Sequence, residues 1–132
     1  SDAKNGTVTV SKLLKKMVKT VTIPATVTID GYTFKVTAVA NNVFKNASRL
    51  KSVVIGANVK SIGKSSFYKC KKLATITFKG IKAPGVGKNA FKSGKSKVTV
   101  KVPKKMKKSQ LNKLKKALKK AGVKKASYKK TK

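Results

Sequence analysis

The hydrophobic positions of this chain recur with a period of 23 to 24 residues. The period is set by Phe44, Phe67 and Phe91, which lie 23 and then 24 residues apart. Apolar residues stand eight and five positions before each phenylalanine and nine and eleven after it: Val36, Val59, Ala83; Val39, Ile62, Val86; Val53, Ile76, Val100; Ile55, Phe78, Val102. Such columns predict a solenoid, in which each repeat buries its apolar face against its neighbours. We therefore expect the three phenylalanines to lie in the core.

Each repeat is predicted to contain a short strand and a compact turn. The strands alternate inward and outward side chains at 53–55, 76–78 and 100–102. The segment around each phenylalanine, such as 39–44, predicts a tight helical turn on the opposite side of the repeat. Ala40, Gly63 and Gly87 share one column. A column of such small residues indicates that the backbones of successive repeats approach closely there.

The N-terminal region predicts a β-hairpin. Alternating apolar residues at 27–29 and 32–36 flank the dipeptide Asp30-Gly31. Asp-Gly favours a two-residue type I′ turn, because both of its central residues need a positive φ. We expect this hairpin to cover the open end of the repeat stack, where an unpaired sheet edge would otherwise meet water.

The pattern changes to helical spacing after Pro103. The apolar positions are Leu111, Leu114, Leu118 and Ala121. Ser109 is the expected N-cap and Gly122 the expected glycine just beyond the helix. We expect this helix to cap the C-terminal end of the repeats; the alternative is a membrane-surface helix. A last strand is predicted around 126–128.

One stretch carries a recognisable repeat motif, Val-Lys-Ser-Ile-Gly-Lys-Ser-Ser-Phe-Tyr-Lys-Cys at 59–70, with further copies at 86–91 and 39–44 and strand-proline elements at 21–24 and 100–103. Over residues 19–104 the chain resembles the BspA-like leucine-rich-repeat family of bacterial cell-surface and secreted proteins. The resemblance implies a curved, right-handed solenoid, export, and binding or adhesion roles, with no shared catalytic residues. Lys97 departs from the pattern, because it stands where Leu50 and Leu73 stand, so we expect an irregular third repeat.

Together these features predict an α+β repeat solenoid, a short right-handed leucine-rich-repeat stack with parallel strands. Residues 1–35 form its N-terminal strands and hairpin cap, 36–103 its leucine-rich repeats, and 104–132 its C-terminal helix cap and lysine-rich tail. We expect the chain to be a terminal piece of a longer surface protein.

The charge is extreme. Lysine and arginine number 35 against two acidic residues, for a net charge of +33, and Arg49 is the only arginine. Charge alone would predict disorder, but the repeat columns supply a core. Lysine is a mobile point charge without the bidentate geometry of arginine, so sequence-specific nucleic-acid recognition is not expected. The lysines indicate either a solvated coat or loose, salt-dependent attraction to a polyanion.

Composition argues against catalysis, metals and cofactors. The chain has no histidine, two separated carboxylates (Asp2 and Asp30) and one cysteine, so acid–base pairs and metal sites lack their usual residues. Cys70 shares a small-residue column with Ala47 and Gly94, which predicts a buried structural thiol. No apolar run approaches the ~18 residues of a transmembrane helix, so no membrane insertion is expected.

The candidate ligand site is the outward side of the repeat strands. It comprises Ser52, Val54, Thr75, Thr77, Thr99 and Lys101. Equivalent residues of neighbouring strands stack about 4.8 Å apart, which predicts a hydroxyl row on the concave face, rimmed by Lys51, Lys79 and Lys97. Repeat proteins commonly bind extended ligands on such faces. The alternative is that serine and threonine merely suit exposed strand positions.

The sequence thus favours an extracellular or cell-surface interaction or adhesion module that binds an extracellular protein, a glycan or an anionic wall polymer. One alternative is a nonspecific binder of polyanions or nucleic acids. A second is a membrane-active cationic protein.

Overall fold

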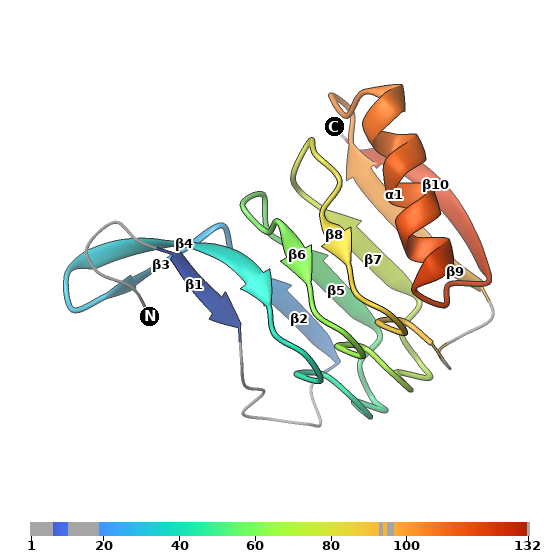
Figure 1. Ribbon diagram of the computed structural model, residues 1–132, viewed down its shortest axis with the longest axis horizontal. Helices are drawn as coiled ribbons and strands as arrows, with labels where there is room; N and C mark the ends of the chain where they lie inside the picture. The colour runs from blue at the N-terminus through green and yellow to red at the C-terminus, as the bar shows by residue number, and fades with distance from the viewer. Residues whose placement is uncertain (1–6, 11–18, 93, 95–96, 132) are drawn as a thin grey trace.

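The computed structural model describes residues 7–10, 19–92, 94 and 97–131, which form two five-stranded sheets and one helix (Figure 1). Sheet A has the order β1 (Thr7–Val10), β4 (Tyr32–Val39), β6 (Ser61–Ile62), β8 (Gly85–Val86), with β3 (Thr26–Ile29) also paired to β4. Sheet B has the order β10 (Lys125–Thr131), β9 (Lys97–Pro103), β7 (Thr75–Phe78), β5 (Ser52–Ile55), β2 (Thr20–Ile23). Every described strand pair except β3–β4 is parallel.

The register of sheet B follows the repeat period. Val53 of β5 pairs with Ile76 of β7, which pairs with Val100 of β9. All three side chains are buried, and the residues on either side of each in the strand point the other way. Alternation along a strand therefore divides sheet B into an apolar face toward sheet A and an outward face.

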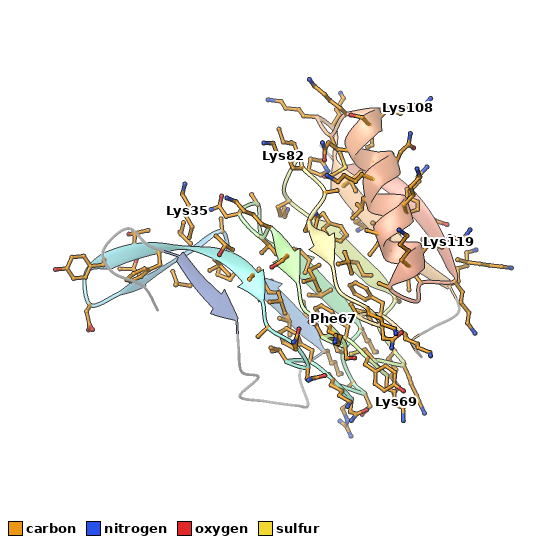
Figure 2. All side chains as sticks on the ribbon, in the orientation of Figure 1. Lys35, Phe67, Lys69, Lys82, Lys108 and Lys119 are labelled. Atoms are coloured by element: carbon orange, nitrogen blue, oxygen red, sulfur yellow. The ribbon has the colours of Figure 1, made fainter. Side chains whose placement is uncertain are left out.

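The three repeat phenylalanines stack in the core on the turn side. The ring centroids of Phe44 and Phe67 lie 5.0 Å apart, as do those of Phe67 and Phe91, with interplanar angles of 12° and 2°. Figure 2 shows Phe67 on the turn side of the repeats, beyond the end of β6. The Phe44 N–H donates to the carbonyl of Ser66 at 2.8 Å, and the Phe67 N–H donates to that of Ala90 at 2.7 Å. Stacked rings and backbone hydrogen bonds thus join each turn to the next.

The turns are not the helical turns that the sequence predicted. Residues two positions before the phenylalanines, Asn42, Ser65 and Asn89, have φ of 65°, 56° and 60°. Asn46 and Lys69, two positions after, have φ of 65° and 61°. Bonds such as Ser66 N–H to the Gly63 carbonyl close four-residue turns with a positive φ at the third residue, as in type II turns. A helix would direct its N–H groups along its own axis, whereas these turns leave alternate N–H groups free to bond the next repeat.

Two glycines allow the repeats to approach as closely as the small-residue column predicted. A Cβ on Gly63 would lie 2.5 Å from the carbonyl carbon of Ala40, and one on Gly87 would lie 2.5 Å from the backbone nitrogen of Lys64. Both obstacles are backbone atoms, which cannot rotate away. The expected close contact is therefore present.

The predicted hairpin is formed by β3 and β4. Its turn residues Asp30 and Gly31 have φ of 52° and 81°, the positive values that a type I′ turn needs. β4 continues across residue 35 into the first repeat and pairs with β6, so the hairpin and the repeats share one strand.

The sequence predicted that the hairpin would cover the N-terminal edge of the stack. In the structure it does not cover this edge of sheet A. Lys35 of β4 pairs with Thr7 of β1 and with Thr26 of β3. A strand residue has one neighbour on each side, so β1 and β3 flank β4 on opposite sides. The described edge of sheet A is therefore β1, and the hairpin projects away from the stack (Figure 1). Its local turn signal carried no information about the side on which it would lie.

The C-terminal helix α1 spans Lys108–Lys120. Its N-cap is Lys107, without a side-chain capping bond, so the expectation that Ser109 caps the helix is wrong; the helix begins before it. The far end is as predicted, because Gly122 has φ of 108°. Gly122 N–H bonds the Lys119 carbonyl and Val123 N–H bonds that of Leu118, which is a Schellman motif.

The end of α1 continues the turn-side hydrogen bonds. The Phe91 N–H donates to the Ala121 carbonyl at 2.9 Å. The equivalent Phe67 N–H donates to the carbonyl of Ala90 in the next repeat. Leu114 and Leu118 are fully buried against the repeats. β10 follows the helix and pairs along its whole length with β9. The last strand is thus longer than the sequence predicted.

Candidate functional site on the outward face of sheet B

The six predicted ligand residues lie side by side on the outward face of sheet B. One row runs through Ser52, Thr75 and Thr99, and a second runs through Val54, Thr77 and Lys101. These pairings come directly from the parallel register of β5, β7 and β9. The structure therefore forms the two rows that the repeat offsets predicted, while ligand binding to them stays a prediction.

Both rows extend further than the sequence predicted. Thr20 of β2 pairs with Ser52, and Ser127 of β10 pairs with Thr99, which makes a hydroxyl row across all five strands. The second row gains Thr22 and Lys129. The Thr-Val-Thr-Ile pattern of β2 matches the Thr-Ile-Thr-Phe pattern of β7. This match could have revealed Thr20 and Thr22 from the sequence alone. β10 has no phenylalanine anchor, so no repeat column pointed to its register.

The character of this face changes from one end to the other. Over β2, β5 and β7 the two rows carry only hydroxyl and small apolar side chains. Over β9 and β10 the exposed lysines Lys97, Lys101, Lys125 and Lys129 join them. Lys51 and Lys79 are exposed at the borders of the strands, as expected of rim residues. Lys97 is instead the first residue of β9 itself.

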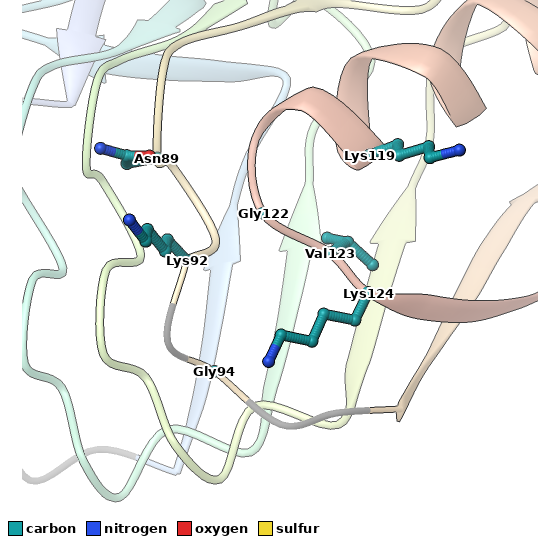
Figure 3. Close-up of a pocket in the computed structure, with 7 residues that line it drawn as sticks. All are labelled: Asn89, Lys92, Gly94, Lys119, Gly122, Val123 and Lys124. Atoms are coloured by element: carbon teal, nitrogen blue, oxygen red, sulfur yellow. The ribbon is translucent and has the colours of Figure 1, made fainter.

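A pocket of about 540 Å³ lies elsewhere, on the turn side beside the end of α1 (Figure 3). Its lining residues include Asn89, Lys92, Lys119 and Lys124. In Figure 3 the three lysine side chains extend in different directions. No common point for an anion is therefore built there, and the pocket is separate from the predicted rows.

Cys70 and Ser66 are buried polar groups of the turn side. The Cys70 thiol donates to the Phe44 carbonyl at 3.1 Å. Burial raises the pKa of the Cys70 thiol to about 11, and a backbone hydrogen bond involving Ala47 lowers it only in part. Since thiolates are the reactive form, we expect Cys70 to react slowly at neutral pH. The Ser66 hydroxyl bonds the carbonyls of Gly63 and Ala40 at 2.6 and 3.0 Å, so both groups serve the structure.

Within the described residues, no three histidine, cysteine, aspartate or glutamate side chains gather where they could hold a metal ion. In the same part of the chain, no helix has the length and apolarity needed to cross a membrane.

Two solved structures resemble this fold. The first is a leucine-rich cell-surface protein from Faecalibacterium prausnitzii, with 26% identity and a TM-score of 0.59 over 74% of this chain and 33% of that protein. The second is a leucine-rich-repeat protein from Bacteroides ovatus, with 21% identity and a TM-score of 0.48 over 69% of this chain and 30% of that protein. The chain thus spans about a third of the length of each. No curated protein matches it significantly.

The family of the chain follows from its repeats. The model of the BspA-type leucine-rich-repeat region matches residues 37–121 in six copies. This segment contains the stacked phenylalanines, the close-packed glycines and the parallel strands β5, β7 and β9. The chain belongs to the BspA-type leucine-rich-repeat family.

Proposed function

We propose that this chain is an interaction module of a bacterial cell-surface or secreted protein and that the outward face of sheet B contacts its partner. The observation that carries the proposal is the hydroxyl row of Thr20, Ser52, Thr75, Thr99 and Ser127, set in register across five parallel strands. A row of donors and acceptors at about 4.8 Å spacing suits an extended partner better than a compact one. Extracellular proteins, glycans and anionic wall polymers are such partners.

The cell-surface location is supported by likeness to the Faecalibacterium prausnitzii protein, which is described as a cell-surface protein. A binding role without catalysis is supported by the kinds of residue that gather on the face, which are hydroxyl, aliphatic and lysine side chains. The described residues place no histidine or carboxylate on this face to act as a base toward a hydroxyl.

We further propose that α1 is the C-terminal cap of the repeat stack. Ala121 supplies the carbonyl that a following repeat would offer to Phe91, and the leucines of α1 cover the apolar face that such a repeat would bury. Terminal caps of this kind are needed by repeat proteins for solubility. The division at residues 35 and 103 stays a prediction.

A second candidate function is nonspecific attraction to polyanions. The observation that favours it is the net charge of +33, which creates a field that any dense polyanion would feel. Binding by charge alone should fall steeply with salt and should not depend on which lysines are present.

The test is a double substitution, Thr75→Tyr with Thr77→Tyr, which places two large side chains in the middle of the face. Tyrosine suits strands, so the fold should survive. The same substitution at Ser61, an exposed residue of β6 in sheet A, is the control. Labelled protein would be applied to an array of bacterial wall polymers, host glycans and matrix proteins at low and high salt.

We expect the wild type and Ser61→Tyr to share a partner that the double variant loses. Equal binding by all three proteins would refute the middle of the outward face, around Thr75 and Thr77, as the site. Binding that vanishes at high salt in all three, with no preference among polyanions, would favour the second candidate.

A further inference from the structure

Strands β9 and β10 carry the same five-residue pattern in register. β9 begins Lys97-Val98-Thr99-Val100-Lys101, and β10 begins Lys125-Ala126-Ser127-Tyr128-Lys129. Each residue of the first pairs with the matching residue of the second. Lysine, hydroxyl, lysine therefore alternate on the outward face of both strands, and the apolar residues between them face inward. The other strands of sheet B lack this pattern.

The pattern exists because the third repeat departs from the other two. Lys97 stands six residues after Phe91. At the equivalent position of the first two repeats, Leu50 and Leu73 are buried, with only 0% and 3% of their surface exposed. In β9 the strand starts at this position, Lys97 is exposed, and Val98 turns inward. A core position has thus become an outward-facing lysine that lies beside Lys125 of β10.

The four lysines form two pairs of like-charged neighbours, Lys97 with Lys125 and Lys101 with Lys129. Like charges directly opposite each other on adjacent strands destabilise a sheet. The carboxylate side chain in the described part of the chain is Asp30, in the hairpin turn at the other end of the molecule from β9 and β10 (Figure 1). No described carboxylate is therefore placed to relieve this repulsion.

We propose that this array of four lysines, with Thr99 and Ser127 between them, is a binding site for a linear polymer that carries phosphate or sulfate groups. The inference rests on the proposed function of the outward face and narrows its partner to one chemical class. Anionic groups of the polymer offset the repulsion between the lysines. The two hydroxyls donate hydrogen bonds to oxygens that lie between the charges.

The dimensions favour a chain over a single small anion. Lys97 and Lys101 are four residues apart along β9, which is about 13 Å in a strand, whereas neighbouring lysines across the strands are about 4.8 Å apart. One phosphate or sulfate can meet a pair of lysines across the strands, but meeting both pairs would require all four flexible side chains to bend toward a single point. A polymer laid along β9 and β10 can contact both pairs at once, and each further contact adds to the affinity.

The experiment measures binding of fluorescently labelled linear polyphosphate and of labelled dextran sulfate to the whole chain. The site variant is Lys101→Gln with Lys129→Gln. Its matched control is Lys113→Gln with Lys116→Gln, which removes the same charge from exposed positions of α1. A third variant, Thr99→Val with Ser127→Val, removes only the hydroxyls.

At physiological salt we expect the site variant to lose about ten- to thirtyfold in affinity and the control about two- to threefold. The slope of log affinity against log salt should fall by roughly 1.5 for the site variant. The hydroxyl variant, with unchanged charge, should lose about fivefold. The site variant should melt at or above the wild-type temperature, since like-charged neighbours have been removed, so lost binding would not reflect unfolding.

Equal losses in the site and control variants would overturn the proposal and assign polymer binding to the general charge. Tight binding of polyphosphate alone, or of dextran sulfate alone, would support the site and show whether it prefers phosphate or sulfate groups. If the polymer arms fail while Thr75→Tyr with Thr77→Tyr still abolishes an array partner, this inference falls and the proposed function stands. If the tyrosines have no effect on array binding while the lysine variant loses the polymer, the contact lies over β9 and β10: the lysine array stands, and the hydroxyl row around Thr75 is refuted as the contact surface.

Discussion

The turn side of the repeats and the outward face of sheet B differ in how much they change along the stack. The turn side repeats one set of contacts, with a phenylalanine, a small residue and a positive-φ residue recurring at the same positions. The outward face keeps its hydroxyl row but passes from Val54 and Thr77 to Lys101 and Lys129 in the second row. Positions that pack against the next repeat are constrained by it, whereas outward positions meet only solvent or a partner.

This difference indicates that stability resides mainly on the turn side and recognition mainly on sheet B. Substitutions on the turn side should therefore lower stability without any ligand present. Substitutions on the outward face should alter binding with little change in stability. Four substitutions test this division.

Phe67→Ala should destabilise the protein most, by about 3–5 kcal/mol. Phe67 is fully buried and stacked on both sides, whereas Phe91 is 5% exposed and has one phenylalanine neighbour. Phe91→Ala should therefore cost less. Urea unfolding of both variants measures the two losses. An unchanged free energy of unfolding for Phe67→Ala would show that the phenylalanine stack does not hold the repeats together.

Gly63→Ala should destabilise by about 1–3 kcal/mol, because the new methyl group meets the backbone of Ala40. The matched control is Gly85→Ala, whose Cβ would lie 3.8 Å from its nearest neighbour, the carbonyl oxygen of Lys60. That control should stay within about 0.5 kcal/mol of wild type. Thermal unfolding compares them. Similar losses in both variants would contradict the close approach of repeats at the glycine column.

Cys70→Ala should be mild, at about 1 kcal/mol, since it removes one buried hydrogen bond and little volume. Its effect should depend on pH. The pKa of the thiol is raised from 9.0 to about 11 in the folded protein, so its stabilising contribution is complete below pH 9 and is lost as the pH rises toward 11.

The lysines also titrate at high pH, so the quantity to follow is the difference in melting temperature between wild type and Cys70→Ala. We expect the wild-type advantage to shrink between pH 9 and 11. Native Cys70 should also resist alkylation at neutral pH and react once urea unfolds the chain. Rapid native labelling would show an accessible thiol on the turn side.

Thr75→Val should have the smallest effect, within about 0.5 kcal/mol of wild type, because valine suits a strand and Thr75 lies on the outward face. Equilibrium urea unfolding measures it. A loss comparable to that of Gly63→Ala would mean that the outward row contributes to folding, and the division between the two faces would then fail.

Much of the fold was determined by the sequence alone. The spacing of Phe44, Phe67 and Phe91 gave the period, and the small-residue column gave the close contact at Gly63. Asp30-Gly31 specified the hairpin turn, and Gly122 specified the end of α1. These are local signals, because a residue's backbone preference or its place in a period is written in the few residues around it. The rows through Ser52, Thr75 and Thr99 followed from the same period.

Other features were decided only by the tertiary structure. The pairing of Lys97 with Lys125 joins segments separated by a helix, and no periodicity spans that distance. Likewise, the side on which the hairpin lies depends on which strands flank β4, and the positive φ at Ser65 and Lys69 serves hydrogen bonds to the next repeat. Strand register and bonds between repeats are contacts between distant parts of the chain. Their geometry is fixed when those parts pack together, because only then do the backbone groups of each repeat find their partners.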